Sequence, residues 1–126
     1  MTIQVLPQNF TICKVSTIPS ELLNEQFCFV GKTDRELSLV CETEKVPKGV
    51  REIENGWRAF RIAGNLPFSL VGILSELSGI LAKARVGIFA VSTYDTDYIL
   101  VKEAQFRTAV EALRRNGIGV DSICAK

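Results

Sequence analysis

Histidine is absent from this chain of 126 residues, so the commonest general base and the commonest metal ligand of proteins are both missing. The sequence contains no Ser or Cys nucleophile motif and no phosphate-binding loop, and Gly64, Gly72 and Gly79 do not form a dinucleotide-binding fingerprint. Asp95 and Asp97 could in principle perform acid–base chemistry, but no other residue supports that role. We therefore expect a protein that is not an enzyme and that holds no cofactor or metal.

An excess of one charge is also lacking. The 15 basic and 14 acidic residues leave a formal charge of +1, which provides no field to attract nucleic acid or an anionic membrane. Polar residues and glycines interrupt the longest apolar stretch, 66–81, so no segment approaches the roughly 18 residues of a membrane span. The first ten residues lack the pattern of a signal peptide. These features predict a cytoplasmic protein without nucleic-acid or membrane partners.

The cysteines lack the spacing of a metal site. Cys13, Cys28, Cys41 and Cys124 form no C-x-x-C pair, so neither structural zinc nor a disulfide framework is expected. Three of them lie in strand-like runs and are predicted to be buried thiols.

What the sequence does contain is a regular C-terminal half. Residues 57–63 alternate apolar and charged side chains, which predicts a strand. A helix is expected to follow, with Ser69 as N-cap and an apolar stripe of Leu70, Ile73, Leu74, Leu77, Ile80, Leu81 and Ala84. Strands at 86–92 and 97–102, a helix at about 103–116 that ends at Asn116-Gly117, and a strand at 118–123 complete the order βαββαβ. This order is typical of a ferredoxin-like α+β sandwich.

The N-terminal half is richer in strands and less regular. Strands are predicted at 10–15, 27–32 and 36–41, with a helical turn at 20–24 and a loop or bridging segment at 43–55. An offset of 61 residues aligns 29–40 with 90–101 and matches Val30 with Val91 and Asp34 with Asp95. We interpret this alignment as an internal duplication.

Two apolar runs in the second copy, 86–91 and 98–101, flank a dense polar cluster of Ser92, Thr93, Tyr94, Asp95, Thr96 and Asp97. A turn needs one or two polar residues, so the surplus indicates either a heavily decorated loop or the rim of a small-molecule site. Asp95 and Asp97 could converge on one side of an extended stretch. Alternatively, the turn is solvated and Asp95 caps its own backbone.

The residues that follow the first predicted strand of the C-terminal half carry a resemblance to a known family. Gly72 at the start of an apolar helix, the run Leu81-Ala-Lys-Ala-Arg-Val-Gly-Ile88 and the run Ser92-Thr-Tyr-Asp-Thr-Asp97 resemble the ACT domain, a βαββαβ regulatory module. The chain is similar to small tandem-ACT proteins, to the regulatory region of aspartate kinase and to arginine sensors of the CASTOR type. The resemblance implies two ACT units, a degenerate one at 1–56 and a complete one at 57–126.

The resemblance also implies that an amino acid binds where two ACT units meet. One wall of the site would be Phe68, Ser69, Leu70, Val71, Gly72 and Ile73; the other would be Ser92, Thr93, Tyr94, Asp95, Thr96 and Asp97. Many ACT units carry an acidic residue where this chain has Leu70, so Asp95 or Asp97 becomes the candidate partner of a ligand ammonium group. We expect a homodimer that acts as a regulatory sensor; the alternative is a protein–protein interaction module of ACT fold without a working ligand site.

Overall fold

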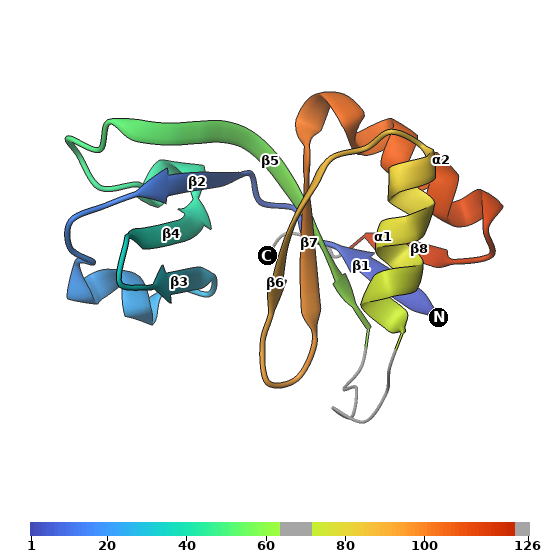
Figure 1. Cartoon of the computed structure of the whole chain (residues 1–126), viewed down its shortest axis with the longest axis horizontal. Coiled ribbons are helices and arrows are strands. Elements are labelled where there is room, and N and C mark those ends of the chain that lie inside the picture. Colours follow the sequence, from blue (N-terminus) through green and yellow to red (C-terminus); the bar gives the residue numbers. More distant parts are fainter. Residues whose placement is uncertain (64–71, 123–126) are drawn as a thin grey trace. The chain divides into compact units, whose positions relative to one another are not determined.

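The computed structural model describes residues 1–63 and 72–122 (Figure 1). The chain divides into two compact units. The N-terminal unit is Gln8–Trp57, and the C-terminal unit combines Met1–Pro7 with Arg58–Lys126. These units are defined by spatial contacts. The division into ACT units at 1–56 and 57–126 is implied by the sequence resemblance and stays a prediction.

The C-terminal unit is a five-stranded sheet with two helices. Its strands are β1 (Thr2–Val5), the second part of β5 (Glu52–Ile62), β6 (Ile88–Ser92), β7 (Asp97–Lys102) and β8 (Gly119–Ser122); its helices are α1 (Ile73–Lys83) and α2 (Phe106–Arg115). The strands are ordered β6-β7-β5-β1-β8 across the sheet. From β5 onward the chain follows the order βαββαβ, and the predicted ferredoxin-like α+β class is confirmed.

Strand β1 was not predicted from the sequence, yet it lies inside this sheet, between β5 and β8. Ile3 is opposite Ile62 in the antiparallel ladder with β5 and opposite Val120 in the parallel ladder with β8. The first strand of the βαββαβ unit is thereby separated from the last one by a strand from the chain's N-terminus. The C-terminal unit therefore needs residues 1–7 to complete its sheet.

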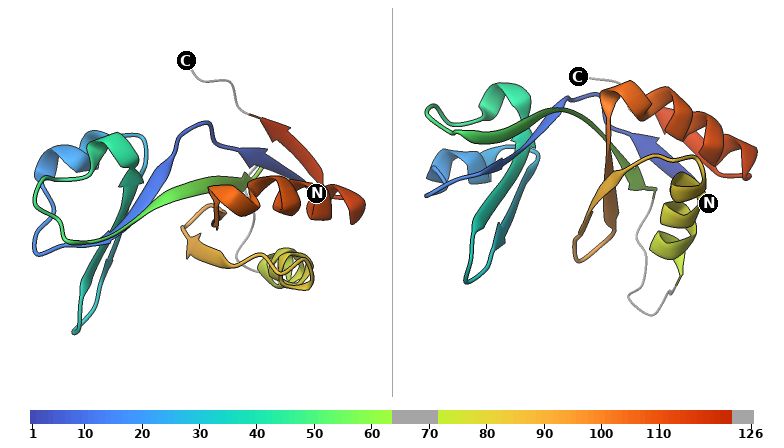
Figure 2. Two further views of the ribbon diagram at one scale, coloured as in Figure 1. Left: turned by 90° about the horizontal axis from the view of Figure 1, so that it is seen from above. Right: turned by 45° about the horizontal axis from the view of Figure 1, so that its top comes forward.

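One apolar core holds both helices on the same face of the sheet (Figure 2). Side chains from β1, β5 and β7 meet Leu77 and Leu81 of α1 and Ala109 and Leu113 of α2. The ring of Phe106 stacks on that of Phe60, with centroids 5.5 Å apart and an interplanar angle of 10°. Burial of these side chains contributes about 25 cal/mol per Å² of apolar area.

Helix α1 begins later than its apolar stripe predicts. The N-cap is Gly72 in the left-handed conformation, with φ +88°, and no side chain caps the helix. The predicted N-cap, Ser69, and the stripe residue Leu70 lie outside the described residues. Ser69 as N-cap is therefore corrected to Gly72, because a left-handed φ is accessible to glycine at little energetic cost.

The N-terminal unit is a four-stranded sheet in the order β3-β4-β2-β5. Its elements are β2 (Phe10–Lys14), β3 (Cys28–Lys32), β4 (Leu37–Glu42), the first part of β5 and 3-10 turns at Ser20–Asn24 and Thr43–Lys45. The loop predicted at 43–55 is wrong in its last part, because β5 already begins at Glu52. The ladder between β2 and β5 shifts register between the pairs Ile12–Glu54 and Phe10–Trp57, and Gly56 there has φ +84°. A bulge with a left-handed glycine lets the strand continue past this point.

The hairpins β3–β4 and β6–β7 have the same lengths and the same register at a constant offset of 60 residues. Cys28 is opposite Cys41 in the first hairpin, and Ile88 is opposite Val101 in the second. The predicted offset of 61 is therefore wrong by one residue in the structure. At the structural offset Thr33 corresponds to Thr93, whereas Asp34 corresponds to Tyr94, so the acidic spacing of the two copies does not coincide.

The predicted burial of cysteines holds in the N-terminal unit, where Cys13 and Cys41 are buried and Cys28 is half-buried. Cys124 lies outside the described residues. Within residues 1–63 and 72–122, no helix is long and apolar enough to cross a membrane.

Candidate functional site

The turn between β6 and β7 is held by the hydroxyl group of Thr93. The Thr93 backbone N–H donates to the Thr96 carbonyl over 2.8 Å, and Thr93 Oγ1 donates to the same carbonyl over 2.9 Å. Thr93 Oγ1 also accepts a hydrogen bond from the Thr96 backbone N–H over 3.4 Å. The alternative in which Asp95 caps the turn is therefore wrong, because Thr93 performs this role.

The same residue type closes the first hairpin. The Thr33 backbone N–H donates to the Glu36 carbonyl over 2.9 Å, and Thr33 Oγ1 accepts from the backbone N–H groups of Arg35 and Glu36 over 3.1 and 3.2 Å. Since the first hairpin repeats this arrangement, the threonine at each turn is explained by the structure of the turn and needs no ligand. The surplus of polar groups at residues 92–97 thus partly belongs to the turn itself.

The remaining polar side chains of the turn differ in what they contact. Ser92 Oγ donates to Asp97 Oδ1 across the ends of β6 and β7. Asp95 is exposed, and its carboxylate makes no hydrogen bond or ion pair with the residues that the structure describes. Tyr94 exposes 81% of its surface. The side chains of Tyr94 and Asp95 are therefore accessible to a ligand, and the carboxylate of Asp97 is already engaged on one side.

The other predicted wall is described only in part. Gly72 is the N-cap of α1 and Ile73 is its first residue, whereas Phe68, Ser69, Leu70 and Val71 lie outside the described residues. The backbone N–H groups of a first helical turn favour an anionic group, and Gly72 offers no side chain to occupy them. The backbone at the start of α1 could thus interact favourably with a ligand carboxylate, as predicted for Gly72 and Ile73.

A hydrogen bond links the turn to the end of β5, which the sequence did not single out. Thr96 Oγ1 donates to the Ile62 carbonyl over 3.4 Å. Arg61, the preceding residue, donates from Nε to Gln4 Oε1 of β1 over 3.0 Å. The turn is therefore fixed against β5, the strand that precedes α1. This contact depends on the order of the strands in the sheet, so no sequence pattern could predict it.

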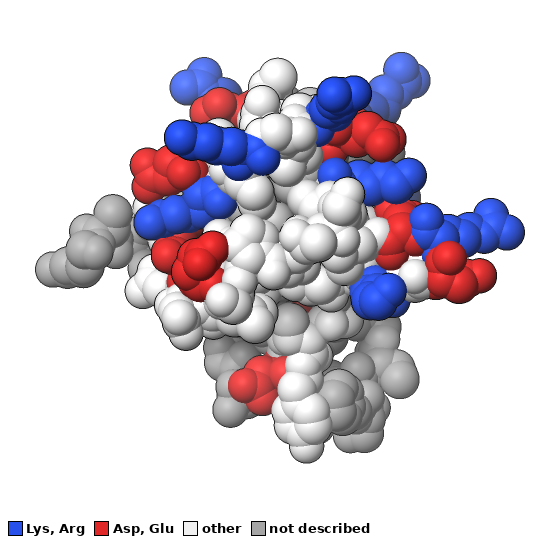
Figure 3. All heavy atoms as spheres, turned by 90° about the vertical axis from the view of Figure 1, so that its left-hand side faces the viewer, with Lys and Arg blue, Asp and Glu red and all other residues white. Residues whose placement is uncertain are grey.

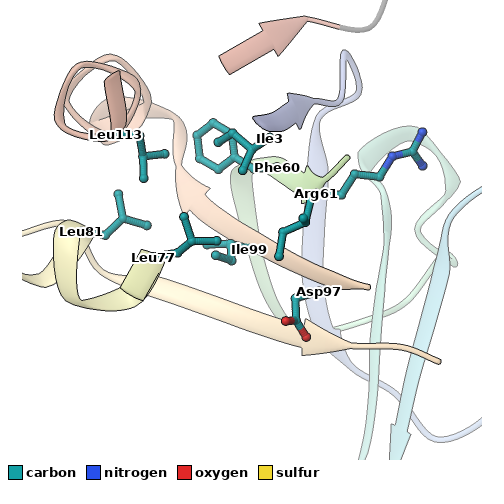
Figure 4. Close-up of a pocket in the computed structure, with 9 residues that line it drawn as sticks. Ile3, Phe60, Arg61, Leu77, Leu81, Asp97, Ile99 and Leu113 are labelled. Atoms are coloured by element: carbon teal, nitrogen blue, oxygen red, sulfur yellow. The ribbon is translucent and has the colours of Figure 1, made fainter. Parts of the chain in front are cut away.

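A small apolar cavity lies between the sheet and the helices of this unit (Figure 4). Phe60, Leu77, Leu81, Ile99 and Leu113 surround it. The carboxylate of Asp97 lies at its edge, while the side chain of Arg61 extends away from it (Figure 4). The cavity volume is about 10 Å³, which is the size of one water molecule. An amino acid does not fit in this cavity, so the cavity is not the predicted ligand site.

The described residues offer no site for a metal ion, because no group of three or more Cys, Asp or Glu side chains among them is placed to hold one. In the N-terminal unit, burial and, to a smaller extent, the neighbouring Cys13, Cys28 and Glu42 together raise the pKa of the Cys41 thiol to about 12. A thiol with so high a pKa stays protonated near neutral pH and is a poor nucleophile. These cysteines are therefore part of the core rather than of a reactive site.

Over about half of its length the chain resembles proteins of known sequence. It is 36% identical over 67 residues to the cytosolic arginine sensor for mTORC1 subunit 1 of Bos taurus and of Homo sapiens. This match covers 52% of the chain but only 20% of either sensor. The chain thus spans about a fifth of the length of these curated relatives.

Solved structures match the fold over nearly the whole chain. A protein from Agrobacterium tumefaciens has a TM-score of 0.88 at 28% identity and is matched over 98% of this chain and 94% of its own. The aspartate kinase of Clostridium acetobutylicum gives 0.64 at 18% identity, over 86% of this chain and 33% of the enzyme. The ligand-free regulatory subunit of aspartate kinase from Thermus thermophilus gives 0.63 at 10% identity, over 90% and 95%. The two kinase matches establish a shared fold.

The family itself follows from the segment that runs from β5 to α2. A sequence model described as the ACT domain matches residues 52–115, which run from the first residue of β5 to the last residue of α2. This chain belongs to the ACT domain family.

Proposed function

We propose that this chain is a non-catalytic regulatory protein of the cytoplasm that binds an amino acid where two ACT units meet. The observation that carries the proposal is the β6–β7 turn, which lies inside the ACT match and presents Tyr94 and Asp95 to solvent. Three of its six polar residues hold the turn or close its ends by donating hydroxyl hydrogen bonds, and Asp95 is left for a ligand ammonium or guanidinium group. Helix α1 supplies the complementary chemistry at Gly72 and Ile73.

The proposal includes a homodimer. The cavity lined by Phe60, Leu77 and Leu81 holds no more than a water molecule, so the proposed amino acid would bind outside it. Small-molecule sites usually bury most of the ligand surface, and an ACT unit of a second protomer would bury the side of the ligand that this unit leaves exposed. The constant offset of 60 residues between the two hairpins supports a tandem repeat with a degenerate N-terminal ACT unit. The similarity to cytosolic arginine sensors makes a basic amino acid the first candidate ligand.

A thermal-denaturation panel of the 20 amino acids tests the proposal. A ligand at 100 times its Kd that binds only the folded form adds about 2.7 kcal/mol to the free energy of unfolding. For a chain of this length the gain corresponds to a rise in Tm of about 10 °C. A panel without any shift, checked by titration calorimetry, would exclude the sensor function and favour an interaction module of ACT fold.

The Asp95→Ala variant tests the site. We expect it to abolish the ligand shift while the Tm of the unliganded protein changes little, because Asp95 is exposed and unpaired within the described residues. Asp34→Ala is the matched control, since it removes the same side chain from the exposed turn of the other hairpin. Equal loss of binding in both variants would contradict a site at the β6–β7 turn.

A further inference from the structure

The N-terminal unit contains a pocket of its own, lined by residues between Lys14 and Pro19 and between Pro47 and Glu52. Its volume is about 550 Å³, within the range of small-molecule sites. It lies where β2 ends at Lys14 and β5 begins at Glu52, two residues that are opposite each other in the antiparallel ladder. Figure 1 shows the segments that follow β2 and precede β5 at the same end of this unit.

The pocket combines an apolar base with a polar rim. Val15 and Val50 line it and also pack against the core around Cys13 and Leu39. Ser16 and Thr17 contribute hydroxyl groups, and both residues are exposed. A ligand with a short carbon skeleton and charged ends would match this arrangement.

Three cations surround the pocket: Lys14, Lys48 and Arg51. Their side chains make no ion pair or hydrogen bond with any residue in the described part of the chain. Glu52 is the only carboxylate among the lining residues, so the pocket carries a local excess of two positive charges. The chain as a whole has a formal charge of +1, and one face of the molecule shows basic and acidic side chains intermingled (Figure 3). The excess at the pocket is therefore local rather than a consequence of the overall charge.

We infer that this pocket binds a small organic dianion, a dicarboxylate or a phosphomonoester. Charge-assisted hydrogen bonds from lysine and arginine to such oxygens are stronger than neutral ones, and an arginine can hold two oxygens at once. Two negative charges on the ligand balance the local excess. The ligand class differs from the amino acid proposed for the C-terminal unit, and the pocket uses none of its residues.

The test is a titration of the ¹⁵N-labelled protein followed by NMR, with succinate and glycerol 3-phosphate as probes and neutral glycerol as the blank. We expect saturable shifts at Lys14–Thr17 and Lys48–Glu52 with a Kd below about 1 mM. The probe with the lower Kd shows whether the pocket prefers carboxylate or phosphate groups. Shifts elsewhere, or shifts that do not saturate, would overturn the inference whether or not amino acids bind at the β6–β7 turn.

The double variant Lys48→Gln/Arg51→Gln removes two cations from the pocket. We expect its Kd for the better probe to rise at least tenfold, a loss of about 1.4 kcal/mol. Lys32→Gln/Arg35→Gln is the matched control, because it removes the same charges from the exposed β3–β4 hairpin of the same unit. Equal weakening in both variants would show general charge attraction and overturn the inference.

Discussion

Arg58 places the central carbon of its guanidinium group 4.4 Å from the centroid of the Phe106 ring. The same guanidinium donates from a terminal nitrogen to the Leu6 carbonyl over 3.4 Å. Phe106 begins α2, Leu6 follows β1 and Arg58 belongs to β5. One side chain thus links three segments of the C-terminal unit.

The Arg58→Met variant should destabilise the protein by about 1–2 kcal/mol, because it removes a half-buried cation–π contact and a hydrogen bond. Urea unfolding followed by circular dichroism measures the change. Arg107→Met is the control, since Arg107 is exposed on α2 and its loss should stay within about 0.5 kcal/mol. Equal effects of the two variants would show that Arg58 acts only through its general charge.

In the β6–β7 turn, we expect Thr93 to contribute to the stability of the protein and Asp95 to contribute to ligand binding. Thr93→Ala removes two hydrogen bonds of the β6–β7 turn and should lower the free energy of unfolding by about 0.5–1.5 kcal/mol without any ligand. Thr33→Ala should have a similar effect in the other hairpin. Asp95→Ala should change the unliganded stability by less than about 0.5 kcal/mol. A Thr93→Ala protein as stable as the wild type would contradict the structural role of this hydroxyl.

The C-terminal ends of α1 and α2 each have a residue with positive φ, and only α2 has a glycine there. Arg85, just after the C-cap of α1, has φ +62°, and Gly117, just after the C-cap of α2, has φ +81°. In both helices the following residue donates a hydrogen bond back into the last turn, Val86 to Leu81 over 2.9 Å and Ile118 to Leu113 over 3.0 Å. These bonds are typical of a Schellman motif, whose left-handed position favours glycine.

Arg85→Gly should therefore stabilise the protein by about 0.5–1 kcal/mol, and Gly117→Ala should destabilise it by about 1 kcal/mol. A Cβ at Gly117 meets no atom within 4 Å, so the second effect comes from the backbone alone. Thermal unfolding of both variants checks the pair. A loss of stability in Arg85→Gly would mean that the arginine side chain contributes more than its backbone strain costs.

Much of the C-terminal unit could be predicted from the sequence, because its strands and helices have strong periodicity. The strand at 97–102 was predicted with the bounds that β7 has. Strand β1 was missed because four residues between the chain start and Pro7 give too short a pattern, although Ile3 and Val5 alternate with polar neighbours. The start of β5 was missed because Glu52–Asn55 are all exposed and therefore show no alternation.

The candidate site could be predicted only as a region. The sequence shows that residues 92–97 are polar, but it does not show which of them bond to one another. Thr93 and Thr96 share the turn and Ser92 pairs with Asp97, so of the two carboxylates only that of Asp95 has no partner among the described residues. Likewise, Lys14 and Arg51 lie far apart in the sequence, and only the ladder between β2 and β5 brings their segments together.

The buried thiols predict a loss of stability at high pH. Burial, together with smaller effects of neighbouring groups, raises the pKa of Cys41 from an ordinary value of 9.0 to about 12, and burial also raises the pKa values of Cys13 and Cys28. Above pH 9 the unfolded chain releases these protons while the folded chain keeps them. The free energy of unfolding should therefore be undiminished below pH 9 and should fall between pH 9 and about 12, by at most about 1.4 kcal/mol per pH unit for each thiol.

The Cys41→Ala variant isolates this effect when urea unfolding is measured from pH 8 to pH 10.5 under reducing conditions. The variant loses a buried side chain, so its stability is lower at every pH, but its decline above pH 9 should be shallower than that of the wild type. Val40→Ala is the matched control: Val40 is equally buried in β4 and carries no titrating group. It should lose stability and keep the wild-type slope. Parallel pH profiles for wild type, Cys41→Ala and Val40→Ala would contradict the elevated pKa, because other groups would then account for the whole decline.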